Sequence, residues 1–172
     1  MMLTSHTNPD AIDWSCLGQC RFLIVVADYN RTITDHLLKG AQDRLHQRVD
    51  AHITVIQIAG ALEIPAVIHQ SFSLHPFDGY LALGCIIRGE TIHFEIVANE
   101  SARGLTLLGQ KGALIANAIL ATETIEQAEF RAGPTQGNRG GEAADALLRL
   151  MLARRSLLGP GDMPGQTDNV SP

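Results

Sequence analysis

Apolar runs alternate with segments of helical periodicity along most of this chain. Four short runs rich in apolar and β-branched residues predict strands, at residues 22–28, 52–59, 80–87 and 114–120. The first run, FLIVVAD, is almost continuously apolar, which is typical of a strand buried on both faces, and the run at 52–59 is expected to form a second core strand. The alanine-rich fourth run is ambiguous by periodicity, and its place between two helical segments favours a strand.

The segments between these runs have the spacing of amphipathic helices. One helical face carries Ile33, Leu37, Leu38, Ala41 and Leu45. Further helices are expected over residues 64–71, 92–111, 124–130 and 142–158, with a glycine-rich loop at 133–141. Strands and helices that alternate with short connections predict βαβ units with right-handed crossovers. The sequence therefore predicts an α/β fold, a flavodoxin-like three-layer α/β/α sandwich around a four-stranded parallel sheet.

The length of 172 residues fits one domain with a sizeable core. Residues 1–20 are polar, and we expect them to form a flexible N-terminal arm with little structure of its own. The folded domain is expected at 21–158. The glycine, proline and polar residues of 159–172 predict a disordered tail.

Charge and composition exclude several classes of partner. The net charge of −5 offers no basic face for nucleic acid, and no apolar run is long enough to span a membrane. The N-terminus lacks a basic start followed by an apolar block, so no secretory signal is expected and the cytoplasm is the predicted location. Three cysteines, Cys16, Cys20 and Cys85, suit neither a disulfide framework nor a complete zinc site, so no metal is expected.

The most informative stretch follows the third predicted strand, at residues 84–95. An apolar run ends in the turn Gly89-Glu90-Thr91, and His93 follows directly at the start of a helix. Exposed N–H groups and the positive end of a helix dipole favour a phosphate there, although an ordinary capped helix start would have the same sequence. An imidazole with a reference pKa near 6.5 suits proton transfer at neutral pH.

Other candidates lie after the remaining strands or around the glycine-rich loop. Tyr29 could stack on a flat ring, Glu63 could accept from a polyol hydroxyl, and Arg131 or Arg139 could clamp an oxyanion. Each also has a simpler explanation in packing, helix initiation or surface solvation. The chain contains no Walker loop, no GxGxxG after the first strand, no HExxH and no GxSxG, which counts against nucleotide-binding, zinc-hydrolase and serine-hydrolase functions.

Together these segments resemble the 6,7-dimethyl-8-ribityllumazine synthase family of riboflavin biosynthesis. The resemblance covers residues 22–155 in order and spacing. Its blocks are VVADYN at 25–30, GALEIP at 60–65, GCIIRGETIHFEIVANES at 84–101, LATETIEQA at 120–128 and RAGPTQGNRGGEAA at 131–144. It implies a transferase that condenses 5-amino-6-(D-ribitylamino)uracil with 3,4-dihydroxy-2-butanone 4-phosphate, releasing phosphate and water. The family needs no metal or organic cofactor, and positioning of two substrates suits a site with few reactive side chains.

The resemblance also implies a role for each matching residue. His93 matches the general acid/base. The phosphate cradle matches Gly89, Glu90 and Thr91, completed by Arg131. The remaining substrate contacts match Tyr29 (stacking on the uracil ring), Asn30 beside it, Ala61 and Glu63 (ribityl chain), and Ile86 and Ile87 (main chain at the uracil edge). Two positions depart from the family: Asn117 stands where many members carry an aromatic residue and is expected to hydrogen-bond instead, and Arg139 stands where lysine is usual.

Family members assemble as pentamers, pairs of pentamers or shells of sixty subunits, with active sites between subunits. The segment around Asn117 and Arg131 would come from the second subunit. In shells the N-terminal arm adds a strand to a neighbour, which Pro9 disfavours here because proline cannot donate to a ladder. We therefore expect a homopentamer, with the decamer and the shell as alternatives.

Two other functions remain open at the level of sequence. The first is a doubly wound enzyme acting on another phosphosugar or aminopyrimidine. The second is a duplicated synthase retained as a flavin-binding, lumazine-binding or shell-forming protein, which the departure at Asn117 motivates. The intact His93 and Arg131 favour an active enzyme over the second.

Overall fold

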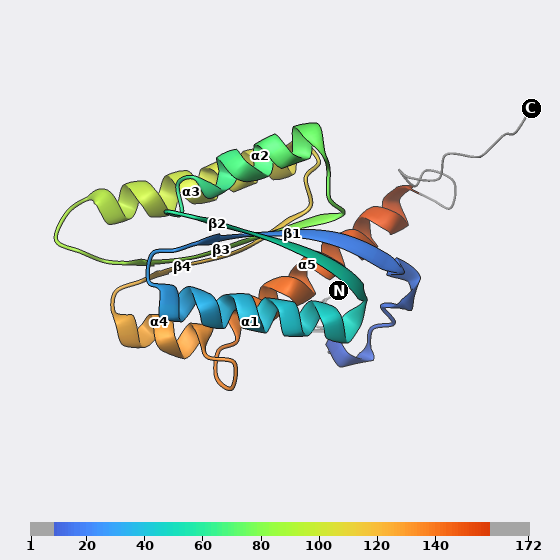
Figure 1. Ribbon diagram of the computed structural model, residues 1–172, viewed down its shortest axis with the longest axis horizontal. Coiled ribbons are helices and arrows are strands. Elements are labelled where there is room, and N and C mark those ends of the chain that lie inside the picture. Colours follow the sequence, from blue (N-terminus) through green and yellow to red (C-terminus); the bar gives the residue numbers. More distant parts are fainter. Residues whose placement is uncertain (1–8, 159–172) are drawn as a thin grey trace, which may run out of the picture.

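A single parallel sheet organises the computed structural model, which describes residues 9–158 (Figure 1). Its four strands are β1 (Gln19–Ala27), β2 (Asp50–Ile58), β3 (Gly79–Ile87) and β4 (Ile115–Thr122), and they lie in the order β2-β1-β3-β4. Every neighbouring pair is parallel. The predicted α/β fold with flavodoxin-like connectivity is confirmed, including the strand assignment of the ambiguous fourth run. The predicted tail at 159–172 and the first eight residues of the predicted arm lie outside the described residues.

Helices cover both faces of the sheet. Helices α2 (Ile64–Leu74) and α3 (His93–Gln110) lie on one face (Figure 1). Helices α1 (Arg31–Arg48), α4 (Ile125–Ala132) and α5 (Arg139–Leu158) lie on the other. The predicted three-layer sandwich is therefore present. No helix in this part of the chain is long and apolar enough to cross a membrane.

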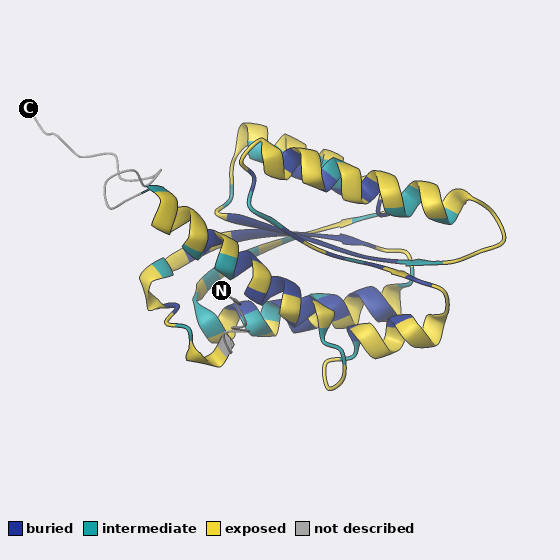
Figure 2. Ribbon diagram, turned by 180° about the vertical axis from the view of Figure 1, so that it is seen from behind, coloured by how far each residue is buried: buried dark blue, intermediate teal, exposed yellow. Residues whose placement is uncertain are grey.

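Strand β1 is buried on both faces, as its continuous apolar run predicts. Phe22, Ile24 and Val26 pack into the cluster shared with α1, α4 and α5. Leu23 and Val25 pack into the separate cluster beneath α2 and α3. Figure 2 shows the buried centre of the sheet between two helical layers with exposed outer faces. Full burial of an aliphatic side chain contributes roughly 1.5–3 kcal/mol, so this strand is a main source of stability.

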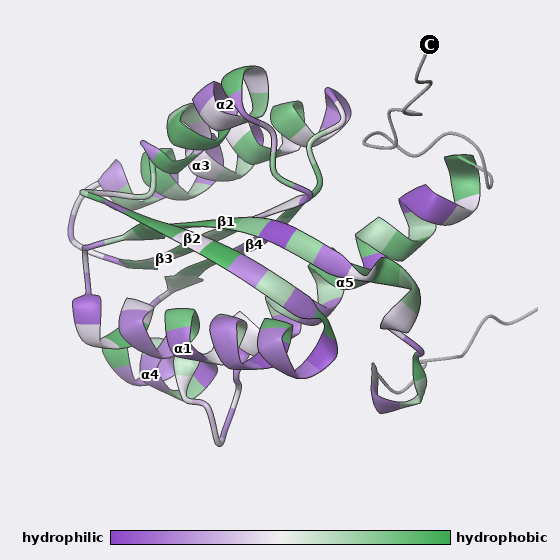
Figure 3. Ribbon diagram, turned by 45° about the vertical axis from the view of Figure 1, so that its right-hand side comes forward, coloured by the Kyte–Doolittle hydropathy of each residue, from purple (hydrophilic) through white to green (hydrophobic). Residues whose placement is uncertain are grey.

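Strand β2 differs from the buried core strand that its sequence predicts. It lies at the edge of the sheet, and its burial alternates along its length. Ile53 and Val55 pack against the cluster that β1 shares with α1, α4 and α5, whereas Thr54 and Ile56 are exposed. Figure 3 shows the corresponding alternation of hydrophilic and hydrophobic residues along β2. The prediction was wrong because an edge strand has one strand neighbour, and α2 and α3 pack over β1, β3 and β4 instead.

The predicted glycine-rich loop at 133–141 ends earlier than expected, because α5 begins at Arg139. Gly140 lies so close to α1 that a β-carbon there would be 2.0 Å from the carbonyl oxygen of Leu37. Asn138 precedes the helix with φ 39°, and its side-chain oxygen accepts from the N–H of Gly141 at 3.1 Å. The absence of a side chain at Gly140 therefore allows α1 and α5 to pack closely.

Residues 9–20 are more ordered than the expected arm. They form two short 3-10 turns, Pro9–Ala11 and Ser15–Leu17, before β1 begins at Gln19. Trp14 between the turns is only 5% exposed and belongs to the cluster that β1 shares with α1, α4 and α5. Burial of this large side chain depends on contacts with distant segments, which a local polar pattern does not reveal.

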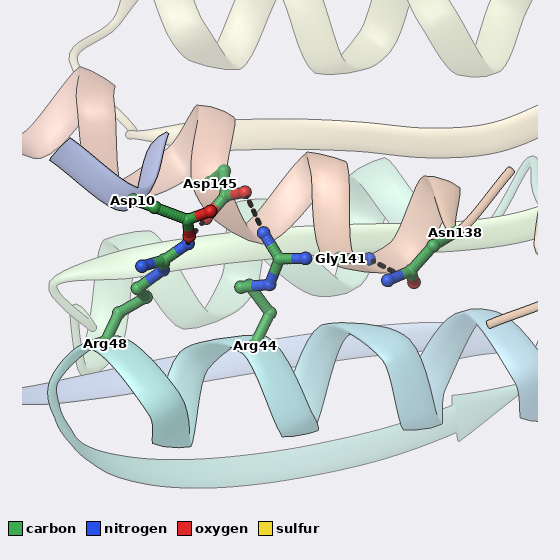
Figure 4. A network of polar contacts seen from close by, with 6 residues as sticks. All are labelled: Asp10, Arg44, Arg48, Asn138, Gly141 and Asp145. Carbon is green, nitrogen blue, oxygen red and sulfur yellow. Dashed lines mark hydrogen bonds and ion pairs between the residues drawn. The ribbon is translucent and has the colours of Figure 1, made fainter. Parts of the chain in front are cut away.

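A buried carboxylate joins α5 to α1 and to this N-terminal segment (Figure 4). Asp145 accepts a hydrogen bond from Arg44, and Nε of Arg48 lies 3.6 Å from its other oxygen. Arg48 also donates to Asp10 at 2.6 Å, and its guanidinium lies 5.9 Å from the ring of Trp14. The Asp145 side chain is 9% exposed, so its charge depends on these arginines for compensation.

Loss of the Asp145 carboxylate should destabilise the protein. Asp145→Ala leaves two partly buried arginines without their shared partner, and we expect the free energy of unfolding to fall by about 2–4 kcal/mol. The matched control is Asp43→Ala, which removes an exposed pair with Lys39 on α1 and should cost less than about 1 kcal/mol. Urea unfolding of both variants measures the difference, and equal losses would contradict a special role for Asp145.

Two of the three thiols should resist alkylation in the folded protein. Burial raises the pKa of Cys20 and of Cys85 to about 11, so very little thiolate exists at pH 8. Cys16 is exposed. Iodoacetamide at pH 8, followed by mass spectrometry, should label Cys16 first and reach Cys20 and Cys85 only after unfolding in urea. Rapid labelling of Cys85 in the folded protein would contradict its burial.

Candidate active site

A pocket of about 550 Å³ lies where β1, β2 and β3 end. Carboxyl ends of parallel strands meet at one edge of a sheet, which is where open α/β sheets bind ligands. The walls of the pocket come from the segments that follow the three strands and from the first turns of α3. The lining residues from the strand ends and their loops are Ala27, Tyr29, Asn30, Ala59, Gly60, Ala61, Leu62, Glu63, Cys85, Ile86, Ile87, Gly89 and Thr91; α3 adds His93, Phe94 and Val97.

The end of β1 is shaped by Asn30. Its backbone is left-handed, with φ 58° and ψ 51°, a conformation that asparagine tolerates better than most residues. Its side-chain amide donates to the carbonyl of Cys85 at 3.0 Å, and its own carbonyl accepts from Ile33 as α1 begins. Asn30 thus ties β1 to β3 and starts a helix. Tyr29, 75% exposed, lies beside it on the pocket wall.

The turn after β2 places a carboxylate in the pocket. Gly60 and Ala61 lead into α2, and Glu63 precedes the first helical residue. The Glu63 carboxylate lies against Gly60, where a β-carbon would be 3.0 Å from Oε2. Glycine therefore leaves the room that this carboxylate occupies, and the exposed carboxylate can accept hydrogen bonds from a ligand.

The turn after β3 brings the start of α3 to the pocket. His93 is the first helical residue, and its N–H donates to the Thr91 hydroxyl at 3.4 Å. Gly89 and Thr91 line the pocket with it. N–H groups in the first turn of a helix have no partner within the helix, and the helix dipole adds positive potential there. This corner can hold an anion beside an imidazole.

Strand β3 also presents an unpaired main-chain edge. Its pairing with β1 ends at Leu83, whereas its pairing with β4 continues to Ile87. Ile86 and Ile87 line the pocket in this last stretch. On the edge that faces β1, Asn30 takes up the carbonyl of Cys85, and the main-chain groups further along have no strand beside them. Such groups can recognise the polar edge of a planar ring.

Four predicted site residues do not line this pocket. Glu90 is exposed on the turn after β3. Asn117 lies on the edge strand β4, where its side-chain oxygen accepts from Ile119 at 2.8 Å, and it faces a separate groove with Leu150 of α5. Arg131 belongs to α4 on the opposite face of the sheet from α3, and Arg139 pairs with Glu142 at the start of α5.

Several lining residues were missed by sequence reasoning. Phe94 and Val97 follow His93 on α3, and helical spacing from His93 could have identified Val97. Cys85 was recognised only as a thiol, and burial raises its pKa to about 11, so it is a neutral side chain at the pocket wall. Within residues 9–158, no group of three or more histidine, cysteine, aspartate or glutamate side chains could hold a metal ion.

Comparison with known proteins identifies the family to which this chain belongs. A model of the family described as 6,7-dimethyl-8-ribityllumazine synthase matches residues 19–155. Proteins of that name from Novosphingobium aromaticivorans and Zymomonas mobilis are 46% and 43% identical, covering 78% and 80% of this chain and 96% and 98% of their own. One from Sphingopyxis alaskensis is 47% identical over 81% of this chain and 97% of its own. The chain belongs to the 6,7-dimethyl-8-ribityllumazine synthase family, transferases of riboflavin biosynthesis.

Proposed function

We propose that this enzyme condenses 5-amino-6-(D-ribitylamino)uracil with 3,4-dihydroxy-2-butanone 4-phosphate to 6,7-dimethyl-8-ribityllumazine, releasing phosphate and water. The observation that carries the proposal is the position of His93. Its imidazole belongs to the first residue of α3, beside the anion-binding corner of a pocket whose other walls suit a ring and a polyol. Family membership supports the same reaction.

The anion-binding corner is the proposed site of the butanone phosphate. Main-chain N–H groups of Gly89, Glu90 and Thr91 and the dipole of α3 would hold the phosphate. Glu90 would contribute through its main chain, since its side chain does not line the pocket. In this arrangement, no lysine or arginine side chain from the same turn is needed to hold the phosphate.

The other walls form the proposed site of the pyrimidine. The exposed ring of Tyr29 would stack on the uracil, and the unpaired edge of β3 at Ile86 and Ile87 would recognise its polar edge. Ala61 and the Glu63 carboxylate would contact the ribityl hydroxyls. Asn30 would act mainly by holding Tyr29 and β3 in place, because its amide is engaged with Cys85.

His93 is the proposed proton carrier. Loss of phosphate, loss of water and ring closure all require protons to move at the butanone carbons and the amine nitrogens. An imidazole beside the phosphate corner can give a proton to the leaving phosphate and take one from the condensing amine. Most of the acceleration would come from holding the two substrates in register.

A second copy of the chain would complete the site. Arg131 and Arg139 lie outside the pocket, and Asn117 faces a groove at the opposite edge of the sheet from β2. A neighbouring subunit would bring its Arg131 to the phosphate and its Asn117 and Arg139 to the pyrimidine. The side-chain oxygen of Asn117 already accepts a hydrogen bond, so its NH2 group is the one suited to donate to the substrate.

We also propose that the assembly is a pentamer. Arg48 and Arg155 bind the segment before β1 through Asp10 and the carbonyl of Cys16 at 2.6 Å each. A segment held on its own subunit from residue 10 onward is poorly placed to extend a neighbour's sheet. This contact supports the smaller assembly over the shell.

Substitution of His93 should slow turnover without abolishing binding. With both substrates, His93→Ala is expected to reduce kcat about 10- to 100-fold, because positioning remains when the proton carrier is lost. Absorbance of the lumazine product measures the rate. The control is His69→Ala on α2, which is exposed outside the pocket and should retain wild-type turnover. Wild-type turnover no faster than the spontaneous reaction would refute the proposed function.

Light scattering in solution tests the assembly. The expected mass is close to five chains of 18.6 kDa each. A particle near sixty chains would refute the pentamer, and a monomer with full activity would refute the shared site as well.

A further inference from the structure

Arg88 connects three segments around the pocket without lining it. It directly follows β3, and its main-chain N–H donates to the carbonyl of Thr122 at 2.9 Å. Its Nε donates to Glu123 at 2.6 Å, and its Nη1 donates to Glu95 in the first turn of α3. The guanidinium therefore braces the turn at 88–92 against the β4–α4 connection on one side and α3 on the other.

The same side chain stacks on a wall of the pocket. The guanidinium carbon of Arg88 lies 4.2 Å from the centre of the Phe94 ring, and Phe94 lines the pocket beside His93. Arginine is well suited to this contact because its planar group can stack on a ring while its edges donate to carboxylates. Arg88 thus contacts Phe94, the residue after His93, and directly precedes Gly89, which also lines the pocket.

The charge of Arg88 is already compensated. Two carboxylates pair with it, and the hydrogen bond from Arg88 holds the pKa of the Glu95 carboxyl below its usual range. An arginine shared between two carboxylates is a weak ligand for a third anion, since a phosphate would have to displace one of them.

We propose that Arg88 is a positioning residue that fixes the main-chain N–H groups of residues 89–91 by bridging Glu95 and Glu123. The inference rests on the proposed function and adds to it the residue that holds the phosphate-binding turn in place. Arg88 acts on the butanone phosphate through the turn and not by direct contact. The effect falls mainly on one substrate, because Tyr29, Ala61 and Glu63 belong to other segments and Ile86 and Ile87 are held by their pairing with β4.

Steady-state kinetics of Arg88→Met and Glu123→Gln distinguish positioning from direct binding. We expect Arg88→Met to raise the KM for the butanone phosphate about tenfold and to change the pyrimidine KM less than about twofold, because only the phosphate corner shifts. Glu123→Gln should raise the same KM about threefold, and the double variant should be no worse than Arg88→Met. If Arg88 bound the phosphate itself, releasing it from Glu123 would leave that KM unchanged or lower it, and the proposal would fail.

The matched control is Arg103→Met, which breaks a comparable exposed pair with Glu100 further along α3. It should leave both KM values unchanged, and an Arg88→Met enzyme that behaves like it would refute the inference. Thermal unfolding checks each variant, and Glu123→Gln alone decides the question if Arg88→Met does not fold.

Titration with inorganic phosphate separates this inference from the proposed function. A wild-type protein without turnover would refute the function. Weaker phosphate binding by Arg88→Met and by Glu123→Gln would still support the role of Arg88, and unchanged binding by both would refute it.

Discussion

Burial of β1 and β3 between two helical layers is the constraint on which the rest of the molecule depends. A parallel strand buried on both faces cannot end in the core, so each strand continues to the same edge before its loop begins. Turns after β1, β2 and β3 therefore meet there, and α3 starts where they meet. A tyrosine ring, a carboxylate and a helix N-terminus come together at this edge.

The two faces of the sheet have different tasks. On the face of α1, α4 and α5, close contact at Gly140 and the carboxylate of Asp145 lock the helices to each other and to the N-terminal turns. On the face of α2 and α3, the helices are placed so that their N-terminal ends reach the pocket. The contacts at Gly140 and Asp145 thus lie away from the residues that line the site, which keeps exposed polar groups.

Sequence reasoning succeeded where the determining contacts are local. The strands follow from apolar runs, and the Gly89–His93 corner follows from a short stretch of adjacent residues. It failed where a residue's role depends on a distant segment. Gly140 is a packing residue only because α1 passes over it, Trp14 is buried by α1 and α5, and Arg88 meets Glu123 across 35 residues of chain. Asn117, Arg131 and Arg139 could be named from the family resemblance, which also implied that Asn117 and Arg131 belong to a second subunit, and all three lie outside the pocket of this chain.

The composition of the pocket wall has an evolutionary consequence. Ala27, Ala59, Gly60, Ile86 and Gly89 have side chains without hydrogen-bonding atoms, so whatever polar recognition they provide comes from the main chain. Main-chain donors and acceptors persist when one small or aliphatic residue replaces another, but they shift when the chain length between strand and helix changes. Among diverging relatives, drift in side-chain identity along these turns is therefore compatible with retained activity. A single insertion or deletion between Ile87 and His93 would instead displace the main-chain groups of this turn relative to the rest of the pocket.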